Sequence, residues 1–198
     1  MYNRKVKKIL TVILIISTIA SAFYLLFSSN LKQISPELES IIKISESATI
    51  SNLSFSYRTS PDGFVLINDH QNWPEELISR ISLFSKRDYE WFSKPGFLGE
   101  GPPSFTINVF KNPDRLSAQS WAETNSLASN IKLVDSPPVP AEVGGVEGIY
   151  YLVLGLYLFD TYVFAYGDEI YLLSGAYYEK GDEYYQKTSD VISTVDFK

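Results

Sequence analysis

The stretch YLFDTYVFAYGDEIYLLSGAY, residues 157–177, decides the fold of this chain. Two runs of aromatic and branched aliphatic residues, 157–166 and 169–177, have the composition that favours β-strands. Between them stands Gly167-Asp168, a dipeptide typical of the two-residue turn of a β-hairpin. The stretch therefore predicts two antiparallel strands joined by a tight turn.

The turn also fixes how the two strands pair, so that Phe164 should face Tyr171 and Val163 should face Leu172. One face of the hairpin is then aliphatic and the other is aromatic. Because both faces are apolar, we expect the hairpin to lie inside a sheet that is covered on both sides. The aliphatic face carries Phe159, Val163, Ala165, Ile170, Leu172 and Ala176, and the aromatic face carries Tyr162, Phe164, Tyr166 and Tyr171.

Further strands are predicted on both sides of the hairpin. Residues 148–154 share its composition, and apolar and polar residues alternate with a period of two along 53–58 and 104–111. Shorter strands are predicted at 64–67 and 77–84, and the proline-rich segment 135–140 is predicted to be a rigid connector.

Helices should pack beside these strands. Ser117 is a suitable N-cap for one helix, with Leu116 and Trp121 forming a hydrophobic staple across its start. After Asp182, apolar residues recur at the spacing of an amphipathic helix, and residues 86–92 favour a short helical turn. The sequence therefore predicts an α+β domain, in which an antiparallel β-sheet is flanked by helices.

An apolar run of 19 residues, Ile9–Phe27, contains no charge, proline or glycine. A bilayer core needs roughly 20 helical residues, so the run predicts a transmembrane helix. Four basic residues within 1–8, against Lys32 alone soon after the run, place the N-terminus in the cytoplasm. A signal peptide cleaved after Ala22 is the alternative, although the apolar run continues beyond that residue. Both interpretations export the rest of the chain.

The chain then divides into a cytoplasmic basic tail at 1–8, a transmembrane helix at 9–27, a stalk at 28–51 and an extracytoplasmic domain at 52–198. Beyond residue 27 lie 13 basic and all 23 acidic residues, a net charge of −10. A charge of that sign repels phosphate backbones. Nucleic acid is therefore excluded as a partner, and the protein is expected at the cell membrane as a single-pass protein.

Few residues are suited to catalysis or metal binding. The chain has no cysteine, which excludes disulfides, thiolate metal sites and a cysteine nucleophile. His70 is the only histidine and stands in a polar stretch, so a surface position is expected. The glycine-rich segment 144–148 leads into a strand rather than a helix, which predicts a turn and not a phosphate-binding loop. We therefore expect no catalytic residue, no metal and no cofactor.

Several short motifs carry a resemblance to a known fold. An opening strand with FSY at 55–57 is followed by a PDG turn at 61–63, the tryptophan-bearing segment SAQSW at 117–121, three antiparallel strands and a last helix ending ISTVDF at 192–197. This pattern resembles the PsbP-like fold, an α/β/α sandwich over an antiparallel sheet, and bacterial single-pass envelope proteins that share it. The resemblance covers roughly residues 52–198 and implies a non-enzymatic accessory domain.

Aromatic residues flank a segment with three glycines and three prolines, residues 94–104. Rigid loops that carry aromatic side chains often recognise partners. The aromatic face of the hairpin is a second candidate contact, and the alternative for both is packing in the core. The candidate contact residues beside the glycine- and proline-rich segment are Tyr89, Trp91, Phe92, Phe97 and Glu100.

These observations favour a non-catalytic binding or accessory domain held on the outer side of a membrane. A hydrolase is the alternative from another class, and it would use carboxylates such as Glu100 with Asp114. Hydrolysis of that type needs two carboxylates about 5 to 10 Å apart in a cleft. A structural envelope-assembly module is the third possibility, and the expected partners are the membrane and other envelope proteins.

Overall fold

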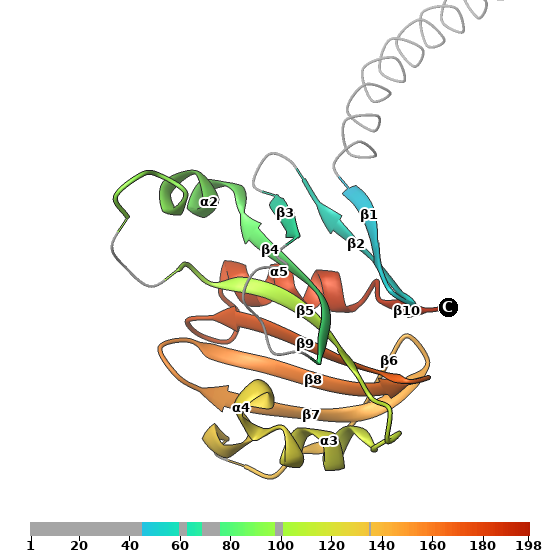
Figure 1. Cartoon of the computed structure of the whole chain (residues 1–198). Helices are drawn as coiled ribbons and strands as arrows, with labels where there is room; N and C mark the ends of the chain where they lie inside the picture. Colours follow the sequence, from blue (N-terminus) through green and yellow to red (C-terminus); the bar gives the residue numbers. More distant parts are fainter. Residues whose placement is uncertain (1–44, 60–62, 69–75, 98–100, 135) are drawn as a thin grey trace, which may run out of the picture. The chain divides into compact units, whose positions relative to one another are not determined.

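Figure 1 shows the computed structural model of the chain, which describes residues 45–59, 63–68, 76–97, 101–134 and 136–198. The predicted tail, the predicted transmembrane helix and residues 28–44 of the predicted stalk lie outside these residues. Within the described part, no helix is both long and apolar enough to cross a membrane.

The described part is a mixed α+β structure in which every paired strand is antiparallel to its neighbours. The strands are β1 (Ser45–Ile50), β2 (Leu53–Arg58), β3 (Phe64–Asn68), β4 (Leu77–Ser85), β5 (Ser104–Lys111), β6 (Val139–Val143), β7 (Val146–Leu154), β8 (Leu158–Tyr166), β9 (Glu169–Tyr177) and β10 (Asp196–Phe197). They form a larger sheet in the order β3-β4-β5-β9-β8-β7-β6 and a smaller one in the order β1-β2-β10.

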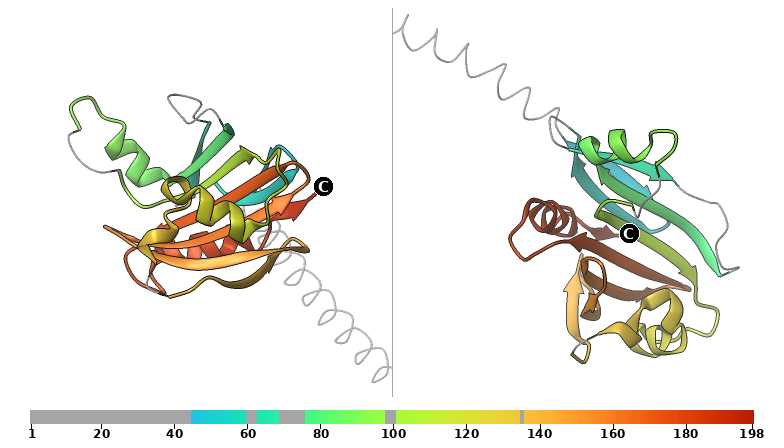
Figure 2. Two further views of the ribbon diagram at one scale, coloured as in Figure 1. Left: turned by 60° about the horizontal axis from the view of Figure 1, so that its bottom comes forward. Right: turned by 90° about the vertical axis from the view of Figure 1, so that its left-hand side faces the viewer.

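Helices flank the larger sheet on both faces. They are α2 (Lys86–Phe92), α3 (Ala118–Thr124), α4 (Ser126–Ser129), the 3₁₀ helix η1 (Ile131–Leu133) and α5 (Glu183–Ile192). The segment α3-α4-η1 and the helix α5 lie on opposite faces of the sheet (Figure 2). The predicted fold class, an antiparallel sheet with flanking helices, is confirmed at this level.

The predicted hairpin is strands β8 and β9, and its register is confirmed. Phe164 pairs with Tyr171 and Val163 pairs with Leu172, across a turn in which Gly167 has a φ of +63°. The two strands lie inside the larger sheet, and both of their faces are covered, as expected. The aromatic face packs in a core with the small sheet and α5, and the aliphatic face packs in a second core with α3.

Helix α3 begins as the sequence predicts. The Ser117 hydroxyl accepts a hydrogen bond from the backbone N–H of Ser120, and Trp121 is only 4% exposed. The Trp121 ring lies 4.9 Å from that of Phe110 in β5, centroid to centroid. The helix is thus held against the sheet by the tryptophan, with Leu116 packed at the edge of the same core.

Two predictions need correction at the edges of the sheets. Residues 45–50, predicted to be part of the stalk, form β1, which pairs with β2 along its whole length and puts Ile50 into the core. In the segment predicted to be a connector, Val139 and Pro140 belong to β6. β6 is an edge strand, where a proline without an N–H donor is tolerated.

Candidate functional site

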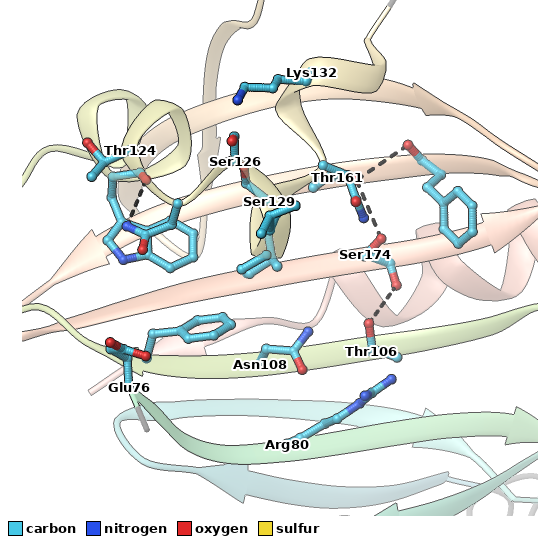
Figure 3. Close-up of a pocket in the computed structure, with 18 of the residues that line it drawn as sticks. Glu76, Arg80, Thr106, Asn108, Thr124, Ser126, Ser129, Lys132, Thr161 and Ser174 are labelled. Carbon is cyan, nitrogen blue, oxygen red and sulfur yellow. Dashed lines mark hydrogen bonds between the residues drawn. The ribbon is translucent and has the colours of Figure 1, made fainter. Parts of the chain in front are cut away.

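A groove of about 840 Å³ lies on the face of the larger sheet that carries α3 and α4 (Figure 3). The helices pack over β7 and β8, and the groove opens where their cover ends, over β4, β5 and β9. Its floor is formed by strand residues, and one wall is formed by the chain from Thr124 to Lys132. Leu127, on this wall, is 95% exposed.

Alternation along β5 makes the floor of the groove polar. Ile107 points to the core shared with the small sheet, whereas its neighbours Thr106 and Asn108 line the groove. Ser174 in β9 and Thr161 in β8 continue the polar surface across the sheet. The floor therefore offers hydroxyl and amide groups within an otherwise apolar sheet face.

Three charged side chains line the groove in the described part of the chain. Arg80 in β4 lies beside Asn108, its cross-strand partner, while Lys132 lies on the opposite side of the floor (Figure 3). Glu76 is the one carboxylate among the described lining residues and lies at one end of the groove, where its carbonyl accepts a hydrogen bond from the backbone N–H of Lys111. The described lining residues thus carry one more cation than anion, although the domain as a whole is acidic.

Four of the five predicted contact residues come together at α2, and the fifth, Glu100, lies outside the described residues. Trp91 and Phe92 each pack edge-on against Phe97, with centroid distances of 4.6 and 5.3 Å. Tyr89 lies 6.2 Å from Phe84, which also stacks on Phe92. The Trp91 side chain remains 57% exposed, so this cluster is partly a surface feature.

A hydrogen-bond network connects α2 to α5. The Tyr184 hydroxyl donates to the Asp88 carboxylate at 2.7 Å, and the Ser85 hydroxyl, which caps α2, donates to the same oxygen. Burial acts to raise the pKa of Asp88, but these hydrogen bonds and the charge of Arg87 outweigh it and hold the pKa below its usual value. Burial and the bond to Asp88 raise the pKa of Tyr184 to about 12.

The aromatic face of the hairpin is not available as a contact surface. Phe164 and Tyr171 are fully buried between the larger sheet and the elements that cover it. Packing in the core, the alternative considered for this face, is therefore confirmed.

Sequence reasoning missed a buried carboxylate, Asp160, which is 7% exposed. It accepts hydrogen bonds from the hydroxyls of Tyr150 at 2.6 Å and Tyr177 at 2.9 Å. Burial, together with these bonds, raises the pKa of both tyrosines. The available signal was an aspartate within an otherwise apolar strand. The two tyrosines satisfy its hydrogen-bonding capacity, so its role is structural.

The remaining candidates do not form a catalytic group in the described residues. His70 lies outside them, and Asp114 is an exposed residue after β5. Among the described residues no cluster of histidine, aspartate and glutamate could hold a metal ion. The predicted turn before a strand is found at Gly144 and Gly145, both at positive φ, and residues 146–148 already belong to β7.

No family model matches the sequence, and no curated protein sequence does either. A solved structure of a protein from Bacteroides thetaiotaomicron aligns with 73% of this chain, with a TM-score of 0.40 and 13% sequence identity. The chain spans 45% of the length of that structure.

Proposed function

We propose that this chain is a membrane-anchored, extracytoplasmic binding or accessory domain that does not catalyse a reaction. The apolar run Ile9–Phe27 and the basic residues before it support the anchor and its orientation. The antiparallel sheet with α3 on one face and α5 on the other supports a PsbP-like sandwich as the finer description of the fold.

The groove is the observation that carries the binding function. Its volume is in the range of small-molecule sites, which are typically 300 to 1,000 Å³. Its polar groups include hydroxyls, amides and two cations, which are groups that bind and orient a ligand. Glu76 is the single carboxylate among its described lining residues, so the pair of acids that the hydrolase alternative requires is not found there.

A ligand screen by NMR on the full chain in detergent tests this proposal. Bound compounds should perturb the resonances of Thr106 and Ser174 and should be recovered chemically unchanged. Thr106→Trp should block binding by filling the groove, while Thr49→Trp, at an exposed threonine of β1, should not. Chemical conversion of a bound compound would instead support the hydrolase.

The same screen separates the groove from the aromatic cluster at α2. Because Trp91 is exposed, we propose that this cluster contacts another envelope protein. Trp91→Ala should leave binding in the groove unchanged. If Trp91→Ala abolished binding while Thr106→Trp did not, the site would lie at α2 and the groove proposal would be wrong.

The anchor is tested separately on the intact protein. Intact-mass measurement of the membrane fraction should show an uncleaved chain, and a reporter that is active only outside the cytoplasm, fused at Lys198, should be active. A mature N-terminus at Phe23 would establish cleavage, and an inactive reporter would overturn the orientation.

A further inference from the structure

A row of hydroxyl side chains crosses the larger sheet within the groove face. Ser82 pairs with Thr106, Thr106 with Ser174, and Ser174 with Thr161, which in turn pairs with Tyr151. Thr106, Ser174 and Thr161, on the adjacent strands β5, β9 and β8, line the groove. Ser82 is buried at one end of the row, and the Tyr151 hydroxyl at the other end donates to the Ser129 carbonyl. Since cross-strand partners lie side by side on one face, the three hydroxyls that line the groove form a continuous polar line.

The hydroxyls at the centre of this row make long hydrogen bonds. Thr161 Oγ1 lies 3.4 Å from Ser174 Oγ and 3.5 Å from the Phe159 carbonyl, and Thr106 Oγ1 lies 3.5 Å from the Ser174 carbonyl. A well-formed O–H···O hydrogen bond is about 2.7 to 2.8 Å long. These three hydroxyls therefore keep most of their hydrogen-bonding capacity for a molecule in the groove.

An amide and a guanidinium stand at one end of the row. Asn108 lies next to Thr106 on the same strand face, and its side-chain amide has no hydrogen bond to any other described residue. Arg80, its cross-strand partner, points into the same space (Figure 3). A guanidinium binds a carboxylate or phosphate through two parallel hydrogen bonds, which sets the orientation of the anion as well as its affinity.

From this arrangement, and given that the groove is a binding site as proposed above, we propose that its ligand is a hydroxylated acid. The carboxylate or phosphate of the ligand binds Arg80 and Asn108, and its hydroxyl groups bind Thr106, Ser174 and Thr161. An acidic sugar and a polyol phosphate share this chemistry. The overall negative charge of the domain repels anions. Arg80 and Lys132 line the groove, however, and attract the anionic group of either ligand there.

Calorimetric titration of the full chain in detergent tests the ligand class with four probes. They are a galacturonate tetrasaccharide, a neutral glucose tetrasaccharide, glycerol phosphate and inorganic phosphate. The acidic sugar or the polyol phosphate should bind, and the neutral sugar should bind about tenfold more weakly than the better of these two. Inorganic phosphate, which lacks hydroxylated carbons, should also bind more weakly than glycerol phosphate.

Matched variants test which residue binds the anionic group of the ligand and which binds its hydroxyl groups. Arg80→Gln should weaken the preferred acidic probe by about tenfold and leave the neutral sugar unchanged. Thr106→Val removes one hydroxyl at constant volume and should weaken both by about threefold. The controls are Arg58→Gln, at an exposed arginine of β2, and Thr49→Val in β1, and neither should change any affinity.

The outcomes separate this inference from the proposed function. If the neutral sugar bound as tightly as the acids, or Arg80→Gln changed nothing while its melting temperature stayed normal, the ligand class would be wrong and the groove would stand as a site. Thr106→Val gives an independent answer should Arg80→Gln fail to fold. If none of the probes bound while other compounds perturbed the groove resonances, the ligand class would again be wrong. If Thr106→Trp left every interaction intact, the proposed function would fail as well.

Discussion

Strand β5 presents two very different surfaces to its two sides. Toward the small sheet it carries Phe105, Ile107 and Val109, all of which are essentially inaccessible to solvent. Toward the groove it carries Thr106 and Asn108, which are half-buried and polar. The hairpin formed by β9, its neighbour in the sheet, and β8 is apolar on both sides for most of its length.

This difference follows the extent of the helical cover. Ile170 of β9 packs in the core under α3, Leu172 belongs to that core and also reaches the groove, and Ser174, further along the same strand face, lines the groove outside the core. Where a helix covers the sheet the residues are apolar, and where the cover stops they are hydroxylated. A strand that is apolar on one side only therefore marks where a sheet face is left uncovered by helices.

The largest effect is expected from truncating Trp121, the side chain that holds α3 against the sheet. Trp121→Ala should lower the free energy of unfolding by about 3 to 5 kcal/mol, because it deletes a buried ring and leaves a cavity against Phe110. Thr124→Ala, at an exposed position of the same helix, should stay within about 0.5 kcal/mol. Urea denaturation of the full chain measures both. Equal stability of the two variants would show that α3 does not hold the sheet.

A second pair of substitutions compares the two faces of β5 directly. Ile107→Ala should destabilise the domain by about 2 to 5 kcal/mol through a cavity in the core beneath the small sheet. Asn108→Ala, at the next residue, removes a groove amide and should cost less than about 1 kcal/mol. The same denaturation experiment applies. A larger loss from Asn108→Ala would mean that the groove face is part of the core.

A third prediction concerns how closely α5 approaches β9. A Cβ placed on Gly175 would lie 2.1 Å from Thr188 Cγ2, so Gly175→Ala should cost about 1 to 3 kcal/mol through overpacking. Adding Thr188→Ala removes the clashing methyl and should restore part of the loss. Non-additive unfolding energies in this double-mutant cycle would confirm the contact, and additive ones would contradict it.

Much of the fold could be predicted from local patterns. The Gly167-Asp168 turn and the apolar residues on both sides of each strand fixed the register and the interior position of the hairpin. Ser117 likewise marked the start of α3. Strands at the edges of the two sheets were harder to predict. β1 is mostly polar, since Ile50 is its one fully buried residue and Ala48 packs only at the edge of the core. Pro140 in β6 is tolerated because an edge strand need not donate a hydrogen bond there.

The groove could not be predicted from the sequence, because it depends on how far α3 and α4 reach across the sheet. Arg80 and Ser174 belong to strands far apart in the sequence, and only the strand order β4-β5-β9 brings them to one floor. The polar residues Thr106 and Asn108, on one side of a strong strand, were the available signal. The aromatic cluster at α2 was predictable because its members lie close together in the sequence.

The smallest effect is expected at the hydrogen bond between Tyr184 and Asp88, which lies outside both faces of the comparison. The pKa of Asp88 is below its usual value, so its contribution to stability is present above that usual value and is lost as the pH falls through the lower, folded-state pKa. The pKa of Tyr184 is raised to about 12, so its contribution is present below its usual value of about 10 and is lost between about pH 10 and pH 12.

Tyr184→Phe should therefore cost about 0.5 to 1.5 kcal/mol near neutral pH and should reduce the loss of stability at both extremes. Tyr178→Phe, at an exposed tyrosine that packs edge-on against Tyr184, is the matched control and should leave the pH profile unchanged. Melting temperatures measured from pH 3 to pH 12 decide the matter, and identical profiles for Tyr184→Phe and the unmodified chain would show that this hydrogen bond does not connect α2 to α5.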